Sequence, residues 1–160
     1  MGRLLLLRLW KFLDEVLPAL LVAFTIVMVS ADVLLRNAFG RTVPYGIELS
    51  TYAFVWMIFL GSAGAARRGR HFHVDILHQK LGARVRLALQ VVLDLACVVI
   101  AAVMTDISWD YTMRSWNRTS EGLQMPLGYF YMIFPLSFAL MALSYLTRMV
   151  GLLRSGPADE

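Results

Sequence analysis

The chain of 160 residues contains one cysteine, Cys97, and three histidines. A single cysteine excludes an intrachain disulfide bond and a zinc site built on cysteines. The chain also lacks a glycine-rich phosphate loop, a Ser/His/Asp or Cys/His arrangement, and a carboxylate pair within any one hydrophobic run. These are the arrangements that support phosphoryl transfer, nucleophilic catalysis and general acid–base catalysis. The sequence therefore predicts a protein that is not an enzyme.

Charged residues are also scarce, at 16% of the chain, whereas hydrophobic residues reach 59% and the mean hydropathy is +0.64. A soluble domain is about half apolar, with its apolar residues spaced by the helix or strand period. Here they are gathered into long runs, which predicts an all-α integral membrane protein. The net charge of +4 does not indicate nucleic-acid binding, because basic residues of membrane proteins set topology and contact anionic lipids.

The segment Leu49–Ala66 organises the rest of the chain. It holds 18 residues without a charge, between Glu48 on one side and Arg67 and Arg68 on the other. About 20 apolar residues in a helix span a bilayer core of roughly 30 Å. A carboxylate is favoured at a helix N-terminus and arginines at a C-terminus, so Glu48 is expected to cap this helix. The two arginines indicate its cytoplasmic end.

Four transmembrane helices are predicted in a single membrane domain of residues 1–160, at about 16–35, 49–66, 87–105 and 123–147. Short interfacial helices are predicted at about 3–13 and 74–81. For residues 3–13 the alternative is a basic start that only sets the orientation of the chain. In the fourth span, Pro126 is expected in the first helical turn and Pro135 is expected to kink the helix.

The distribution of basic residues predicts the orientation. An even number of spans places both termini on one side of the membrane, and eleven of the 15 Lys and Arg residues fall on that side. The positive-inside rule then predicts cytoplasmic N- and C-termini.

Two carboxylates fall within predicted spans, where a charge is costly and is a candidate for function. Asp94 is expected about 12 Å deep in the third span, one turn after Gln90. It is interpreted as a buried charge that pairs with a basic residue of a neighbouring helix or hydrogen-bonds to Gln90, with a proton site as the alternative. Asp32 lies near the outer end of the first span, four residues before Arg36, and is interpreted as an interfacial ion pair. A partner contact or an ion path is the alternative for Asp32.

Small residues Gly61, Gly64 and Ala65 in the second span predict close helix packing, within the chain or onto another subunit. The three histidines His71, His73 and His78 lie outside the spans, which excludes a haem held between the helices. A surface metal site at these histidines is the alternative. No metal or other cofactor is expected in this chain.

Several short patterns occur together and in order. The first span ends in Arg36-Asn37 followed by Phe39-Gly40, and a loop with Pro44 leads to Glu48. The second span carries an aromatic and small-residue set, the basic sequence RRGRHFHVDIL follows, and the fourth span begins with two tyrosines and a proline (Trp56, Phe59, Leu60, Gly61, Ala63; 67–77; Tyr129, Tyr131, Pro135). From about Leu13 to Gly151 the chain resembles the small membrane subunit of tripartite ATP-independent periplasmic (TRAP) transporters.

The resemblance implies a role in a sodium-driven transporter of the bacterial inner membrane that takes up organic acids or related solutes. It implies two partners, a large multi-span membrane subunit in one-to-one ratio and a periplasmic solute-binding protein. The large subunit would hold the solute and sodium ions, and this chain would brace it and help dock the binding protein. Arg36, Glu48, Arg67 and Arg68 match or lie near positions of the family pattern, whereas Asp94 matches none.

Three other classes compete with this interpretation. A small four-span proton-coupled exporter would use Asp94 or Asp32 as its coupling carboxylate, although Asp32 lies late in its span. A membrane-bound redox subunit is disfavoured by the positions of the histidines. A scaffold without a transport role is the third alternative. Replacement of Asp94 by asparagine separates the exporter from the subunit, because it abolishes coupling in the first and affects assembly or stability in the second.

Overall fold

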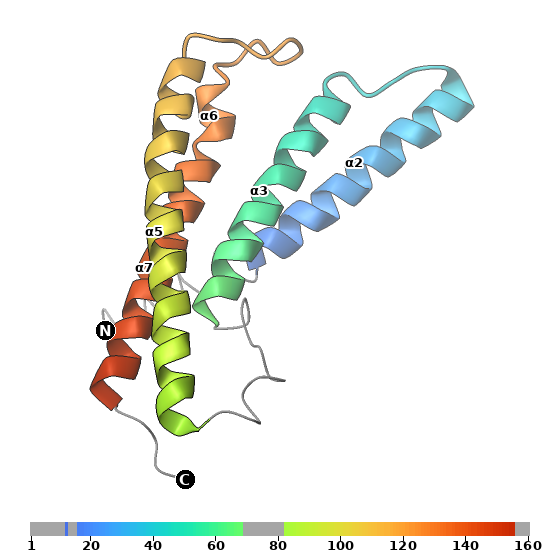
Figure 1. Cartoon of the computed structure of the whole chain (residues 1–160). Helices are drawn as coiled ribbons and strands as arrows, with labels where there is room; N and C mark the ends of the chain where they lie inside the picture. Colours follow the sequence, from blue (N-terminus) through green and yellow to red (C-terminus); the bar gives the residue numbers. More distant parts are fainter. Residues whose placement is uncertain (1–11, 13–15, 69–81, 156–160) are drawn as a thin grey trace, which may run out of the picture.

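The computed structural model describes residues 12, 16–68 and 82–155. Within these ranges all regular elements are helices, labelled in Figure 1 as α2 (Leu17–Phe39), α3 (Gly46–Arg67), α5 (Ala83–Ser115), α6 (Gly128–Tyr131) and α7 (Ile133–Ser155). The predicted interfacial helix at 74–81 and the three histidines lie outside the described residues, as does nearly all of the helix predicted at 3–13.

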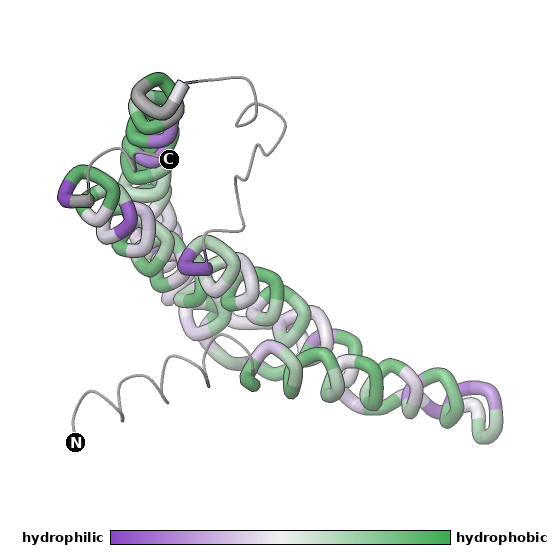
Figure 2. Tube along the Cα trace, turned by 90° about the horizontal axis from the view of Figure 1, so that it is seen from below, coloured by the Kyte–Doolittle hydropathy of each residue, from purple (hydrophilic) through white to green (hydrophobic). Residues whose placement is uncertain are grey.

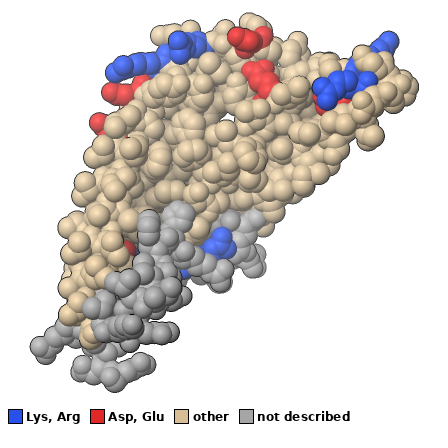
Figure 3. Space-filling view, turned by 45° about the vertical axis from the view of Figure 1, so that its right-hand side comes forward, with Lys and Arg blue, Asp and Glu red and all other residues tan. Residues whose placement is uncertain are grey.

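Four helical segments are long and apolar enough to cross a membrane: Leu17–Phe39, Gly46–Arg67, Leu87–Ser115 and Gly128–Arg154. This confirms the predicted all-helical, four-span fold. The third helix is longer than predicted, because α5 has 33 residues and is therefore about 50 Å long at 1.5 Å per residue. It exceeds the roughly 30 Å bilayer core by several turns. Figure 3 shows the charged side chains near the ends of the described molecule, with a broad uncharged band between them.

The helices form two hairpins, α2 with α3 and α5 with α7, and α3 packs against α7 to join them. Figures 1 and 2 show the resulting order α2, α3, α7, α5 as a row rather than a closed bundle. One end of the row carries the connections 40–45 and 116–127 and is called the loop end. The open row leaves apolar side chains exposed on most of its surface, and only 6% of the α2 span is buried.

The contact between α5 and α7 uses small hydroxyl residues. The buried positions of α5 lie three, four or seven residues apart, on one face of the helix, and are small or polar (Asp94, Ala101, Ser108, Thr112, Ser115). Their hydroxyl groups donate to carbonyls one turn earlier, for example Thr112 Oγ1 to the Ser108 carbonyl at 2.7 Å and Ser115 Oγ to the Tyr111 carbonyl at 2.8 Å. Small side chains with satisfied donors let two helices approach closely in lipid.

The fourth span differs from the prediction at its start. Pro126 is not in a helical turn, because residues 123–127 form an irregular loop in which Pro126 bridges to Thr119. The helix begins at Gly128 and is interrupted at Met132, three residues before Pro135. Proline has no backbone N–H and so cannot bond the carbonyl four residues earlier, that of Tyr131. The predicted local disturbance by Pro135 is therefore present, as a break between α6 and α7.

Side chains of two other helices bond the carbonyls exposed at this break. The Thr112 hydroxyl of α5 shares its one proton between the Ser108 carbonyl at 2.7 Å and the Tyr131 carbonyl at 3.2 Å. Trp56 Nε1 of α3 donates to the Phe130 carbonyl at 3.1 Å. The Tyr52 ring of α3 also stacks on Phe130, with centroids 3.6 Å apart. The break thus becomes the place where α3 joins the second hairpin.

Replacing Trp56 by phenylalanine is expected to lower the stability of the chain by about 0.6 kcal/mol, the average for hydrogen bonds between membrane helices, and by no more than about 1.7 kcal/mol. Phenylalanine keeps an aromatic ring but leaves the Phe130 carbonyl without its donor. Thermal unfolding in detergent measures the change. Trp109→Phe is the matched control, because Trp109 is 50% exposed and makes no such bond; equal losses in both variants contradict a role for the hydrogen bond.

Candidate functional site

Glu48 organises the loop end of the molecule. It lies in the first turn of α3, and its two carboxylate oxygens accept different donors: the Tyr52 hydroxyl at 3.0 Å and the backbone N–H of Leu123 at 3.1 Å. A side chain at Gly122 would overlap the Glu48 carboxylate and lie 2.9 Å from the Tyr45 ring. Glu48 was predicted to stabilise the start of its own helix. In the structure the N-cap position is Tyr45, and Glu48 lies in the first turn, where its charge favours the helix start. Its carboxylate fastens the 116–127 loop of the other hairpin to that helix start.

A cavity of about 700 Å³ lies between the two connections at this end. Its walls carry the carboxylates of Glu48 and Glu121 together with polar and aromatic side chains, including Tyr45, Tyr52 and Thr119. Figure 3 shows acidic side chains on this end of the space-filling surface. The cavity therefore offers hydrogen-bond acceptors and negative charge on the side of the molecule away from the end of α7.

Replacing Glu48 by alanine is expected to free the 116–127 loop from α3, because the Leu123 N–H loses its acceptor. Hydrogen exchange at the Leu123 amide is expected to become faster. The variant Glu48→Gln keeps a side-chain oxygen and is expected to retain more protection. Unchanged exchange in the alanine variant would show that Glu48 does not hold the loop.

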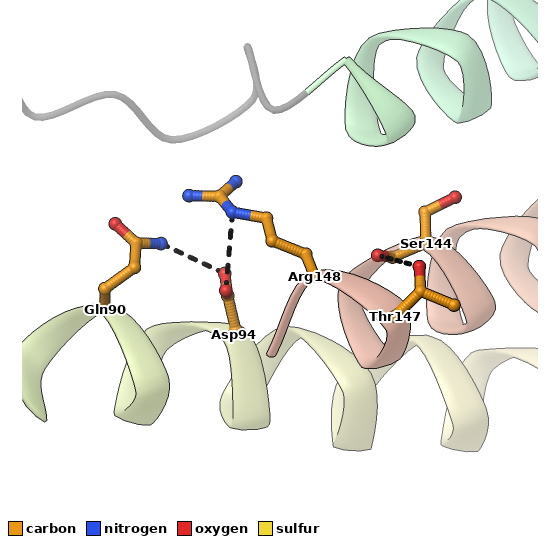
Figure 4. Close-up of polar contacts among 5 residues, drawn as sticks. All are labelled: Gln90, Asp94, Ser144, Thr147 and Arg148. Atoms are coloured by element: carbon orange, nitrogen blue, oxygen red, sulfur yellow. Dashed lines mark hydrogen bonds and ion pairs between the residues drawn. The ribbon is translucent and has the colours of Figure 1, made fainter. Parts of the chain in front are cut away.

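Asp94 forms an ion pair across the α5–α7 contact (Figure 4). Its side chain is 3% exposed, and Oδ2 lies 3.4 Å from Nε of Arg148, whose side chain is 22% exposed. Gln90 Nε2 donates to the other carboxylate oxygen at 3.0 Å. The interpretation of Asp94 as a structural charge with a basic partner on another helix and a Gln90 bond matches this geometry. The carboxylate holds α5 and α7 together at the end opposite the loop end.

Asp32 is buried as well, at 5% exposure, but its partner differs from the prediction. Oδ1 accepts the backbone N–H of Val43 at 2.8 Å, in the connection between α2 and α3. Within residues 16–68 and 82–155, no ion pair joins Asp32 to Arg36. The expected i, i+4 pair is therefore wrong, because the connection folds back and brings a fixed backbone donor to the carboxylate.

The remaining residues singled out from the sequence lie at the helix ends and along α3. Arg36 is exposed in the last turn of α2, and Arg67 and Arg68 are exposed at the end of α3. Gly64 is buried inside the chain, whereas Gly61 and Ala65 are half-buried. A Cβ atom added at Gly61 would meet nothing within 4 Å. The use of this small-residue segment as a partner interface stays a prediction.

The described part of the chain offers no obvious chemistry. It brings together no group of three or more His, Cys, Asp and Glu residues that could hold a metal ion. The carboxylates Asp32, Glu48 and Asp94 belong to three separate places and each binds another part of the chain. Such an arrangement fits a protein that packs against others in the membrane.

Comparison with known families agrees with this description. The profile of the family described as "Tripartite ATP-independent periplasmic transporters, DctQ component" matches residues 25–155. This range covers the last three spans and most of the first.

Three relatives illustrate the similarity. The C4-dicarboxylate TRAP transporter small permease protein of Vibrio cholerae is 26% identical over 119 residues, which cover 71% of this chain and 51% of that protein. A putative TRAP transporter small permease protein of Haemophilus influenzae is 24% identical over 136 residues, covering 85% of this chain and 84% of that protein. The isethionate TRAP transporter permease protein DctMQ of Oleidesulfovibrio alaskensis is 29% identical over 115 residues, covering 70% of this chain and 18% of that protein. This chain thus matches about half the length of the Vibrio cholerae relative.

Proposed function

Because the chain belongs to the DctQ component family of tripartite ATP-independent periplasmic transporters, we propose that it braces the large subunit of a sodium-driven transporter fed by a periplasmic binding protein. The chain is a small membrane subunit of this transporter class and not an enzyme, as the sequence predicted. Sodium and solute would bind the large subunit rather than this chain.

The open row of helices is the observation that carries the bracing role. A polar solute needs a chamber lined by polar groups from several helices, whereas α2, α3, α7 and α5 lie side by side with apolar faces exposed. Large exposed apolar faces in a membrane chain contact lipid or another membrane protein. In the relative named DctMQ, the segment that matches this chain is 18% of a much longer permease protein. A small subunit joined to a large one in a single chain would be present in a one-to-one ratio, which supports the same ratio here.

The loop end is the proposed docking face for the binding protein. The distribution of basic residues predicts that both termini lie in the cytoplasm. In this orientation the 40–45 and 116–127 connections face the periplasm. The acidic cavity with Glu48 and Glu121 then faces the soluble partner. The names of the relatives refer to C4-dicarboxylates and isethionate, which are organic anions, and we propose that the transporter of this chain takes an organic acid or a related solute.

Uptake by reconstituted protein tests the proposal. Liposomes with the large subunit, this chain and the cognate binding protein are expected to take up solute under an inward sodium gradient. Liposomes without this chain are expected to show little uptake. Uptake that is independent of this chain, or that follows a proton gradient alone, contradicts the proposal. The second result would favour the alternative in which Asp94 or Asp32 couples transport to protons.

A further inference from the structure

Asp32 is a buried carboxylate that forms no ion pair within the described chain. It is the one buried residue of α2, whose other residues are half-buried or exposed. Its contact with the Val43 N–H is its single hydrogen bond, and within residues 16–68 and 82–155 it forms no ion pair. A carboxylate can accept about four hydrogen bonds, so much of its capacity is unused.

The carboxylate lines a groove between α2 and α3 with a volume of about 370 Å³. The walls are mainly apolar (Met28, Val29, Val33, Ile47, Phe54). The hydroxyls that line the groove donate to carbonyls of their own helices: Thr25 to Leu21 at 2.8 Å, Ser50 to Gly46 at 2.7 Å and Thr51 to Ile47 at 2.9 Å. Each hydroxyl has one hydrogen, so these three groups present acceptors to the groove rather than donors. Arg36 lines the groove edge but makes no ion pair with Asp32.

A buried carboxylate without a counter-charge is costly at the position of Asp32. Asp32 lies seven residues before the end of α2 at Phe39, which is about 10 Å along the helix. A charge buried within a span pairs with another charge or lines a water-filled path. Asp94 at the other end of the molecule shows the first solution, because Arg148 supplies its counter-charge within the chain. Asp32 has no equivalent on α3.

We propose that the groove around Asp32 receives a lysine or arginine side chain from a membrane-spanning helix of the large subunit. The proposal rests on the function proposed above and names the contact. The charge complements Asp32, the donors of a cation match the acceptors of the groove, and the apolar rim matches an apolar helix surface.

The first test removes the charge and keeps the shape. Asp32→Asn retains an oxygen for the Val43 N–H, so the isolated chain is expected to unfold like the unsubstituted protein. The amount of large subunit that co-purifies per copy of this chain is expected to fall by about tenfold or more, because the partner's cation would be left buried and unpaired. Asp110→Asn is the control, since Asp110 is exposed and pairs only on the surface with Arg114. An unchanged ratio in Asp32→Asn overturns the proposal.

The second test identifies the occupant. A photo-crosslinking amino acid at Ile47, which lines the groove and is 64% exposed, is expected to capture a peptide of the large subunit. That peptide is expected to contain Lys or Arg within one helical turn of the crosslinked residue. Replacement of that basic residue by aspartate together with Asp32→Arg is expected to restore co-purification. Capture of lipid only, of a second copy of this chain, or of a peptide without a basic residue overturns the proposal.

Different results of the co-purification would contradict the proposed function and the proposed contact. If the unsubstituted chain brings down no large subunit, the proposed function is wrong and the contact falls with it. If the unsubstituted chain and Asp32→Asn bring down the large subunit equally, the function stands and the role of Asp32 is wrong.

Discussion

Replacing Arg148 by methionine is expected to destabilise the chain by about 3 kcal/mol, near the lower end of the range for breaking a buried ion pair. Methionine fills similar space but leaves the Asp94 carboxylate, 3% exposed, without its counter-charge. The lower end applies because Arg148 is 22% exposed and solvent or headgroups reach it. Gln90 would remain as a neutral donor to one carboxylate oxygen.

The double variant Asp94→Asn with Arg148→Met supplies the control. It removes both charges, and replacing a buried pair by neutral groups costs little compared with removing one partner. The double variant is therefore expected to recover most of the lost stability, measured by thermal unfolding in detergent or by unfolding in mixed micelles. A double variant as unstable as Arg148→Met alone would contradict a pairwise role for the two charges.

Replacing Gly128 by alanine is expected to cost about 1–3 kcal/mol, the typical range for overfilling a packed site. Gly128 is buried at the start of α6, and an added Cβ would overlap the Trp116 ring, with Cδ2 at 2.8 Å and Cζ3 at 2.9 Å. Trp116 also contacts the Tyr129 ring, with centroids 4.9 Å apart, so a shift of the Trp116 ring would disturb this contact as well.

Gly61→Ala is the matched control for this prediction. A Cβ at Gly61 meets nothing within 4 Å, and alanine favours the helix over glycine by about 1 kcal/mol. The isolated chain with Gly61→Ala is therefore expected to be as stable as the unsubstituted chain or slightly more so. Additional replacement of Trp116 by leucine is expected to relieve Gly128→Ala. Equal effects of the two glycine substitutions would show that the contact with Trp116 is not decisive.

Long apolar runs made the four helices predictable, because their length and composition leave few other structures in a membrane. It was also predictable that Asp94 needs a partner, because an unpaired charge within an apolar span is costly. Its partner Arg148 was not, because the sequence does not say which face of α7 turns toward α5. The recurrence of small and hydroxyl residues from Ala101 to Ser115 is a signal that could have indicated the α5–α7 contact.

Contacts between distant segments explain the wrong predictions. Asp32 and Arg36 have the spacing of a helical ion pair, yet Asp32 binds the Val43 amide, whose position depends on how the connection folds. Pro126 has the position of a helix start, yet residues before Gly128 form a loop whose Leu123 amide binds Glu48, 75 residues earlier. Such long-range donors override local preferences and cannot be read from spacing along the chain.

The composition of the complex in the native membrane tests the proposed bracing role most directly. The chain, tagged at its C-terminus and extracted in a mild detergent, is expected to bring down one large multi-span membrane protein in equal amount, as measured by native mass spectrometry. Recovery of the chain alone, or only as a dimer of itself, would contradict its role as the bracing subunit of a larger transporter.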